Sequence, residues 1–543
     1  MEQFNTLKRR TTDLLQNAQS NMPAMPNMPQ NLLRRQSQPD FVKGTWERID
    51  LPPLPRSSHS LDIVAGAAYI FGGEINPREP VDNDMHVIRL PYSSAGADYY
   101  KIKATATVPD VSPQQEIQEE IQAEAEQAAS SEASLREVPL EQPATAKDKG
   151  KGRATDEPPA LDDVPEPRVG HATAVIGSRI FMFGGRGGPD MKPLEEAGRV
   201  WVFDTRSRSW SYLDPIPAVK GGAIVPHPAP RSYHCAAATE KPDSFGRSDP
   251  VRKPRNWREW AVGDLSKTGI PQDPVVGHVA ETAVDEEDAG YGTFIVHAGC
   301  LASGDRTSDV WAFDVRSRMW TELPAAPGPS RGGTAICISK SRLFRYGGYD
   351  GEQEVGGQLD FLNFEVEMFD DNGTKSEVAI RSRGPWQSIL QHNVDASSTD
   401  IPAEPRQDWP SARSVASLQA ITVGGGRELL VLSFGEQSPS SEGHAGAGKF
   451  LDDVWTFQVP PQGMSAASLT AAVMQAVGRK TGEGRWNKVV TLPYDDDVDD
   501  SLPAGRGWLA SAPMTNLEDS GILFWGGLSE DNKRLGDGWI LRL

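Results

Sequence analysis

The chain has 543 residues, of which 38% are hydrophobic, and its formal net charge at neutral pH is −20. Nucleic acids and anionic membranes attract a basic protein surface, so this acidic balance argues against general binding of either. No stretch of 18 or more apolar residues occurs, so the sequence predicts no membrane span. Three cysteines are too few for a disulfide framework, which favours free thiols in a reducing compartment. We therefore expect a cytoplasmic protein, and access to the nucleus stays open.

The first 40 residues read as a tail that is disordered or amphipathic. Its apolar residues at helical spacing are Phe4, Leu7, Leu14, Leu15 and Ala18. A stretch rich in methionine and proline follows at residues 21–29 and would end such a helix.

A short apolar strand that ends in two glycines recurs along the rest of the chain. The glycine pairs are Gly72-Gly73, Gly184-Gly185, Gly347-Gly348 and Gly526-Gly527, and Ala298-Gly299 and Phe434-Gly435 take the same position. Glycine tolerates positive φ, so we expect a sharp turn at each mark. A polar loop and a further strand follow each mark. These third strands are predicted at residues 85–88, 200–203, 310–313, 366–369, 454–457 and 539–541.

The number of strands predicts how the chain closes on itself. Six marks and six third strands occur, but only five fourth strands with an aromatic residue follow them. The segment Thr45–Ile49, ahead of the first repeat, has the pattern of the missing fourth strand. Four-stranded units of this kind must pack radially to bury both faces. We therefore predict an all-β fold, a six-bladed β-propeller over residues 41–543 that is closed by an N-terminal strand.

Three insertions interrupt the predicted propeller. Residues 104–164 are acidic and too polar to order themselves, so we expect a disordered segment. Residues 240–290 contain a basic stretch with two tryptophans, which predicts a loop over the rim or a partner-binding segment. Residues 461–484 have the apolar spacing of a short helix.

The repeat unit resembles a known family. Gly-Gly after an apolar strand, followed by a spaced tryptophan, is similar to the kelch repeat. Galactose oxidase is built on the same type of propeller, but a likeness of fold does not transfer its function.

An arginine closely preceded by proline stands before each first strand. The six residues are Arg56, Arg168, Arg231, Arg331, Arg413 and Arg506. First strands line the central channel of a propeller, so these arginines are expected to form a ring near one channel mouth. Guanidinium groups suit sulfates, phosphates and carboxylates, so the ring is a candidate ligand-binding site. In the alternative interpretation each arginine bonds to carbonyls and aspartates of the neighbouring blade, with Asp204 and Asp314 as partners.

Histidines follow three of these arginines at a fixed spacing. His59, His171 and His234 lie at equivalent positions of three successive blades, where they should diverge around the ring. We therefore expect them to make structural hydrogen bonds and not to share a metal ion.

Several short stretches resemble one kelch subgroup, the nitrile-specifier and epithiospecifier proteins. They are Arg56-Ser57-Ser58-His59, Phe71-Gly72-Gly73-Glu74, Arg331-Gly332-Gly333, Pro410-Ser411-Ala412-Arg413-Ser414 and Arg506-Gly507-Trp508. The resemblance implies a non-haem Fe(II) site that redirects sulfated aglycones, with arginines that hold the sulfate. Its iron ligands follow the pattern Glu-x3-Asp-x3-His, and the nearest spacing here is Arg78, Asp82 and His86, with arginine in place of glutamate. Asp82 and His86 are therefore the candidate metal ligands.

The sequence favours a protein-interaction scaffold that uses its loops and tail, without catalysis, a catalytic residue or a cofactor. A rigid fold with long variable loops commonly serves recognition, and the identity of the protein partner stays open. The alternative is a specifier-like Fe(II)-dependent enzyme, or a binder of a small sulfated or anionic ligand at the channel mouth.

Overall fold

We describe the protein from a computed structural model in which the chain divides into two units, Met1–Phe41 and Val42–Leu543. All described residues lie in the second unit. They are residues 42–91, 96–107, 162–217, 224–239, 292–368, 378–391, 408–424, 427–441, 446, 448–460, 484–494, 502–514 and 521–543. The predicted tail, insertion 240–290 and almost all of insertions 104–164 and 461–484 lie outside these residues.

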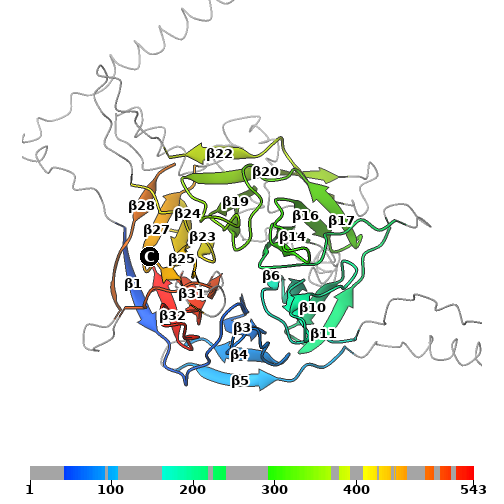
Figure 1. The fold of residues 1–543 in the computed structure, drawn as a ribbon, viewed down its shortest axis with the longest axis horizontal. Helices are drawn as coiled ribbons and strands as arrows, with labels where there is room; N and C mark the ends of the chain where they lie inside the picture. The colour runs from blue at the N-terminus through cyan, green and yellow to red at the C-terminus, as the bar shows by residue number, and fades with distance from the viewer. Residues whose placement is uncertain are drawn as a thin grey trace, which may run out of the picture. The chain divides into compact units, whose positions relative to one another are not determined.

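Six antiparallel sheets lie side by side around a common axis and form the blades of a propeller (Figure 1). Blade 1 contains β2 (Ser60–Val64), β3 (Ala67–Phe71), β4 (Met85–Arg89) and β5 (Asp98–Ile102). Blade 2 contains β6 (Ala172–Ile176), β7 (Arg179–Phe183), β10 (Val200–Asp204) and β11 (Ser209–Leu213). Blade 3 contains β13 (Cys235–Thr239), β14 (Thr293–His297), β16 (Val310–Asp314) and β17 (Met319–Leu323). Blade 5 contains β23 (Ser417–Val423), β24 (Arg427–Ser433), β27 (Val454–Gln458) and β28 (Trp486–Lys488).

Blade 6 joins the two ends of the propeller. It contains β30 (Ala510–Pro513), β31 (Gly521–Trp525), β32 (Gly538–Arg542), β1 (Lys43–Arg48) and β29 (Val490–Pro493). Strand β1 runs antiparallel to β32, where Trp46 pairs with Leu541, which confirms the predicted closure. Strand β29 adds to the other side of β1 in parallel, a fifth strand that the sequence did not predict.

Blade 4 differs from the prediction in its third strand. It contains β18 (Ala335–Ser339), β19 (Arg342–Tyr346), β20 (Gln358–Met368), β21 (Val378–Ser382) and β22 (Gln387–Leu390). The third strand was predicted at residues 366–369, but the segment that pairs with β19 is Leu359–Asn363. This segment contains the polar residues Asp360 and Asn363, so it does not have the wholly apolar pattern on which the prediction was based.

The glycine marks have the predicted conformation. The first residue of a mark has positive φ even where it is not glycine, as at Ala298 (61°) and Phe434 (62°), which match Gly184 (62°). A Cβ on Gly72 would lie 2.5 Å from the carbonyl oxygen of Arg168, so the backbones of adjacent blades meet here. Apolar side chains fill the spaces between blades, as where Phe71 of blade 1 packs on Trp210 of blade 2.

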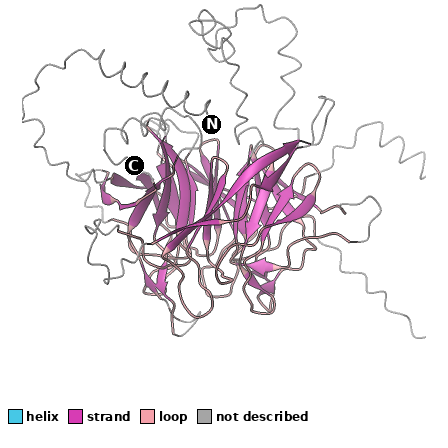
Figure 2. Cartoon of the chain, turned by 90° about the horizontal axis from the view of Figure 1, so that it is seen from above, coloured by secondary structure: helices cyan, strands magenta, loops and turns pink. Residues whose placement is uncertain are grey.

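Three two-stranded sheets extend the loops that follow the glycine marks. They are β8 (Arg186–Gly187) with β9 (Lys192–Pro193), β12 (Arg231–Ser232) with β15 (Cys300–Leu301), and β25 (Glu436–Ser438) with β26 (Lys449–Phe450). The described residues form only strands and loops (Figure 2). Among them, no helix has the length and apolarity needed to cross a membrane.

Candidate functional site

The six predicted arginines join adjacent blades. Each is buried, with at most 2% of its surface exposed. In every blade the arginine Nη1 donates to the carbonyl of the first residue of the glycine mark, as Arg168 does to Gly184 at 3.0 Å. The arginine's own carbonyl accepts the N–H of the second residue of the preceding blade's mark, as Arg168 does from Gly73 at 3.0 Å. One residue thus links two blades through its side chain and its backbone.

In four blades the arginine also binds a carboxylate that a tryptophan contacts, and this carboxylate is buried in blade 2 and partly buried in blades 3, 5 and 6. In blade 3, Arg231 donates to the two oxygens of Asp309 at 2.6 and 2.8 Å, and Trp311 Nε1 donates to the same carboxylate at 2.8 Å. We call this arrangement the Arg–acid–Trp set. The four sets are Arg168–Glu196–Trp201, Arg231–Asp309–Trp311, Arg413–Asp453–Trp455 and Arg506–Asp537–Trp539.

The acids in these sets are not the ones that we expected. Asp204 and Asp314 were predicted as partners of the arginines, and this was wrong. Both cap the turn after the third strand, where Asp204 accepts the N–H of Arg206 at 2.7 Å and Asp314 accepts the hydroxyl of Ser317 at 2.6 Å. The true acids precede the third strand of the arginine's own blade, because that end of the sheet faces the arginine.

The positive charge of the arginines in these sets is largely compensated within the blades. Burial raises the pKa of Asp309, but the hydrogen bonds and positive charge of Arg231 overcome this effect and hold the pKa below its usual value. Removal of one partner from such a buried pair would leave an uncompensated charge. We therefore assign the Arg–acid–Trp sets to the architecture.

Two of the three predicted histidines bond to neighbouring blades, whereas both ring nitrogens of the buried His59 lack a hydrogen-bond partner, so the prediction fails for His59. His171 Nε2 lies 3.0 Å from the hydroxyl of Ser60, and His234 Nε2 lies 3.1 Å from the carbonyl of Phe183. Burial holds the pKa of His171 well below its usual value and lowers that of His234 to about 3. Both rings are therefore neutral and structural.

Asp82 and His86 form a pair without a third metal ligand. His86 Nε2 lies 3.1 Å from Asp82 Oδ1 and 3.3 Å from Arg56 Nη2, and Nδ1 lies 2.8 Å from the hydroxyl of Tyr99. Burial and the charge of Arg56 lower the pKa of His86. No three His, Cys, Asp or Glu side chains of the described residues gather into a possible metal site. The residues present therefore do not fit the three-ligand iron centre that the resemblance implies, and the Arg56 cation opposes one.

A ring of backbone hydrogen bonds closes the channel near the arginines. It is formed by the residues two positions after each arginine, Ser58, Gly170, Tyr233, Gly333, Val415 and Trp508. Each N–H donates to the carbonyl of the member in the preceding blade at 2.7–3.2 Å, and all six residues have positive φ. The side chains of Tyr233 and Trp508 come from opposite blades and pack at 5.1 Å across the axis. We call these six residues the floor ring.

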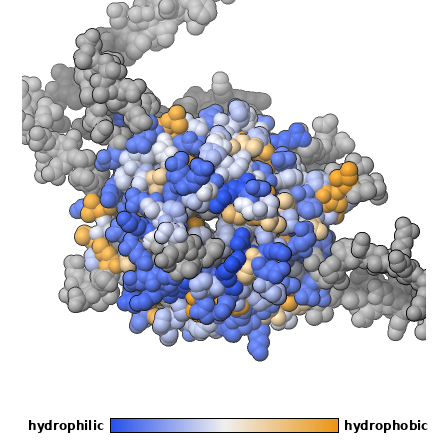
Figure 3. All heavy atoms as spheres, viewed as in Figure 1, coloured by the Kyte–Doolittle hydropathy of each residue, from blue (hydrophilic) through white to orange (hydrophobic). Residues whose placement is uncertain are grey.

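A second group of side chains surrounds the mouth above the floor ring. They directly follow the glycine marks and pair with the residues after the arginines. These mouth positions are Glu74, Arg186, Cys300, Tyr349, Glu436 and Leu528. Figure 3 shows strongly hydrophilic residues around a hollow at the centre of the face that it displays.

Two arginines at this mouth have no carboxylate partner among the described residues. Arg186 Nε donates to the hydroxyl of Ser232 at 2.9 Å, and its guanidinium carbon lies 4.9 Å from the ring centre of Tyr233. Arg306 lies 4.9 Å from the ring centre of Tyr349, and its buried Nε has no hydrogen-bond partner. Both residues are partly exposed, and neither forms an ion pair with a described carboxylate.

The acids near the mouth cancel this positive charge only in part at neutral pH, because the ionised Asp350 interacts with the charge of Arg306. Glu74 is paired with Arg534 at 2.8 Å. Burial raises the pKa of Glu354 to about 8 and that of Glu436 to about 7, so at neutral pH Glu354 is largely protonated and Glu436 is about half protonated. Asp350 is ionised, and its carboxylate accepts backbone N–H groups at 2.8 Å.

The sequence reasoning missed Arg186, Arg306 and the acids of the sets. The signal for Arg186 was present, because it directly follows Gly184-Gly185 at a mouth position. The acid of three sets was also visible as Asp-x-Trp, at Asp309, Asp453 and Asp537.

A family model and several known proteins resemble this chain. A family model described as Kelch motif matches residues 167–217. Over 91% of its length the chain is 23% identical to N-(sulfonatooxy)prop-2-enimidothioate sulfolyase of Thlaspi arvense, of which it covers 95%. It is 26% identical to kelch-like protein terF of Aspergillus terreus over 35% of this chain and 40% of that protein. A solved structure titled "Structure of YjhT" aligns over 90% of this chain and 95% of that one, with 12% identity and a TM-score of 0.41.

The matched motif and the six closed blades define the class: this chain is a kelch-repeat β-propeller protein. Within that class, it resembles a sulfolyase over nearly the whole length of both chains.

Proposed function

We propose that this propeller binds a small sulfated or similarly anionic molecule at its channel mouth, above the floor ring. The observation that carries the proposal is the pair Arg186 and Arg306, two guanidinium groups without a carboxylate partner among the described residues. The six arginines of the predicted ring are buried and bonded to carbonyls, so we assign ligand contact to the mouth arginines instead.

The chemistry of the mouth suits a sulfate ester with an organic group. A guanidinium offers planar paired donors that match two oxygens of a sulfate. The aromatic rings of Tyr233 and Tyr349 lie beneath these cations and offer apolar surface to the rest of the ligand. The floor ring keeps such a ligand at the mouth, because Tyr233 and Trp508 meet across the axis.

The similarity to the Thlaspi arvense sulfolyase supports a sulfated ligand over a scaffold that binds none. That protein's name states an action on a sulfonatooxy compound. We assign no catalytic residue to this chain and derive no step through iron, because Asp82 and His86 lack a third ligand among the described residues.

Calorimetric titration with sodium sulfate and methyl sulfate tests the proposal. We expect saturable binding to the full-length protein and at least a tenfold loss of affinity in Arg186→Gln and Arg306→Gln, as on the order of 1.5 kcal/mol is expected for a charged hydrogen bond. Arg316→Gln, in the turn at the far end of blade 3, is the matched control and should bind as the unchanged protein does. Equal affinity in all variants, or no binding at all, would overturn the proposal.

A protein-interaction scaffold is the second candidate, and one feature favours it. The outer strand β29 exposes Val490 and Leu492 by 46% and 51%, and Tyr494 directly after it is 61% exposed. An extended partner segment could add to this edge as a further strand. On this interpretation, Leu492→Lys should abolish binding of a partner identified by proximity labelling while sulfate binding at the mouth stays unchanged.

A further inference from the structure

Blade 4 keeps the buried arginine but not the acid and tryptophan that accompany it elsewhere. Strand pairing aligns Leu359 with Val310 of blade 3, because Tyr346 and His297 are their partners. Gln358 therefore stands where Asp309 stands, and Asp360 stands where Trp311 stands. Arg345 also breaks the pattern, since the equivalent residues in the other blades are apolar. These are Ile70, Met182, Val296, Leu432 and Phe524.

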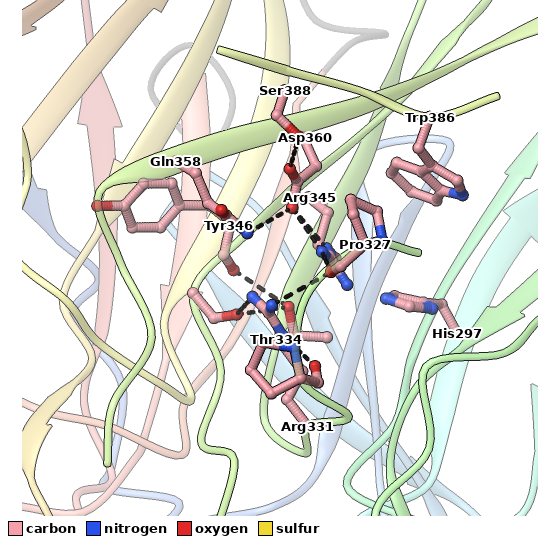
Figure 4. A network of polar contacts seen from close by, with 12 residues as sticks. His297, Pro327, Arg331, Thr334, Arg345, Tyr346, Gln358, Asp360, Trp386 and Ser388 are labelled. Atoms are coloured by element: carbon pink, nitrogen blue, oxygen red, sulfur yellow. Dashed lines mark hydrogen bonds and ion pairs between the residues drawn. The ribbon is translucent and has the colours of Figure 1, made fainter. Parts of the chain in front are cut away.

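Because of these replacements, blade 4 contains two buried cations, Arg331 and Arg345, and one buried anion, Asp360. Arg345 and Asp360 are at most 1% exposed. Oδ2 of Asp360 accepts from Arg345 Nε at 3.1 Å, from Arg345 Nη2 at 2.5 Å and from Gln358 Nε2 at 3.2 Å, while Oδ1 accepts from Ser388 at 2.5 Å. Both carboxylate oxygens of Asp360 thus already accept hydrogen bonds from neighbouring side chains (Figure 4).

Arg331, the blade 4 member of the arginine ring, is left without a carboxylate. It donates to the carbonyls of Gly347 and Pro329, both at 3.1 Å, and of Pro327 at 3.5 Å. Burial and the charge of Arg345 lower the pKa of Arg331 to about 10, so it is still protonated at neutral pH. The blade therefore holds one buried positive charge in excess among these groups.

An unused donor and an unused acceptor come together at the seam between blades 3 and 4. Arg345 Nη1 and His297 Nε2 are buried and have no hydrogen-bond partner. His297 Nδ1 lies 2.8 Å from the carbonyl of Asp309, which can only accept, so Nδ1 carries the ring proton. Burial and Arg345 lower the pKa of His297 to about 3, so the ring is neutral and Nε2 offers a lone pair.

A partly exposed tryptophan separates these two atoms from solvent. The Arg345 guanidinium carbon lies 5.5 Å from the ring centre of Trp386, and the His297 ring lies 6.1 Å from it. Figure 4 shows Arg345, His297 and Trp386 facing one another. Trp386 is held on one side by the hydrogen bond from Nε1 to the carbonyl of Pro324, at 2.8 Å.

We propose that Arg345 and His297 form a second binding site, separate from the mouth, for a small oxyanion that carries a proton, such as hydrogencarbonate or hydrogenphosphate. One ligand oxygen accepts from Arg345 Nη1, and the ligand hydroxyl donates to His297 Nε2. The negative charge compensates the excess cation of blade 4. Sulfate carries no proton at neutral pH, so it cannot satisfy the histidine lone pair and is excluded.

The test uses full-length protein with both Arg186→Gln and Arg306→Gln, so that the mouth does not contribute. Calorimetric titration near pH 7.5 with hydrogencarbonate and with inorganic phosphate should show saturable binding, whereas sulfate should show none. His297→Phe should weaken binding at least tenfold. Phenylalanine fits this position, because Phe71 and Phe183 occupy it in blades 1 and 2.

A second variant separates loss of binding from loss of structure. Gln358→Glu adds the carboxylate that four other blades hold, so it should raise the thermal midpoint while it weakens phosphate binding at least fivefold. Absence of saturable binding would mean that water alone bridges the two atoms, and this would overturn the proposal. Equal binding of sulfate, or full affinity in His297→Phe, would overturn it as well.

Discussion

Blades 2, 3, 5 and 6 each hold a complete Arg–acid–Trp set, whereas blades 1 and 4 keep only the arginine in that arrangement. All six blades share the bond from the arginine to its own glycine mark and the bond from the preceding blade's mark to the arginine's carbonyl. The comparison teaches that these two bonds are enough to build a blade. The acid and tryptophan positions can then change, and departures from a repeated pattern are where function is expected.

The two exceptional blades differ from each other in how their charges are balanced. In blade 1, Asp84 occupies the acid position but pairs with Lys101 at 2.7 Å, and His86 takes the tryptophan position beside Arg56 and Asp82. In blade 4, the amide of Gln358 replaces the acid, and Arg331 is left without a carboxylate. Both blades therefore hold a ring arginine that bonds to no carboxylate, and both contain buried polar atoms without a partner, such as Arg56 Nε in blade 1 and Arg345 Nη1 in blade 4. Blade 4 differs in that it adds a second buried cation, Arg345.

The largest expected loss of stability comes from replacing an arginine of an Arg–acid–Trp set while its carboxylate partner remains. Arg413→Met leaves the partly buried carboxylate of Asp453 uncompensated, which should cost about 3–5 kcal/mol of unfolding free energy. Arg331→Met removes hydrogen bonds to carbonyls but leaves no carboxylate unpaired, so the loss of unfolding free energy should be about 1–3 kcal/mol. Urea midpoints followed by tryptophan fluorescence measure both. Equal losses in the two variants would show that the acids do not distinguish the blades.

The next effect concerns pH, because the acids of the sets and of the mouth have opposite pKa shifts. Burial raises the pKa of Asp453, but Arg413 outweighs it and lowers the pKa below 3.8. Its contribution to stability is therefore present above that pH and is lost as the pH falls through the lowered pKa. Burial raises the pKa of Glu354 from 4.5 to about 8, so stability falls as the pH rises between these values.

Glu354→Gln isolates the mouth acid. It should raise the free energy of unfolding at pH 8 by on the order of 2 kcal/mol and leave it nearly unchanged at pH 4.5. Thermal midpoints by circular dichroism at the two pH values provide the measurement. A shift of the same size at both would contradict the raised pKa.

The smallest expected effect lies in blade 1 and concerns iron. Asp82 and His86 offer two ligands beside the Arg56 cation, so anaerobic Fe(II) titration should give the same iron content in the unchanged protein and in Asp82→Asn. Stoichiometric iron that is lost in Asp82→Asn would contradict this expectation and return the enzyme interpretation to blade 1.

The architecture could be predicted from the sequence because each blade repeats the same local sequence pattern. Positive φ at the glycine marks and an apolar strand before them mark every blade, even where Ala298 or Phe434 replaces glycine. The N-terminal strand was readable from the missing fourth strand. Strand β29 was not, because Val490–Pro493 carries no mark and pairs only with β1, far away in sequence.

The candidate sites were harder to predict from the sequence because they depend on which side chains from different blades contact one another. The positions of the six arginines were evident, but their partners required knowing that the acid before the third strand faces them. Arg306 and Tyr349 meet from different blades, and so do His297 and Arg345, and no local pattern announces either contact. Gln358 at an acid position becomes meaningful only when the strand register is known.

The central claim is that the ring arginines build the blades while Arg186 and Arg306 hold an anionic ligand. The most direct test is the anomalous diffraction signal of selenium in crystals of the full-length protein soaked in selenate, a sulfate analogue. We predict a selenium peak at the mouth within contact of the Arg186 and Arg306 guanidinium groups, and its loss in crystals of Arg186→Gln. A mouth without a peak, or a peak beside Arg168, Arg231, Arg413 or Arg506, would contradict the account.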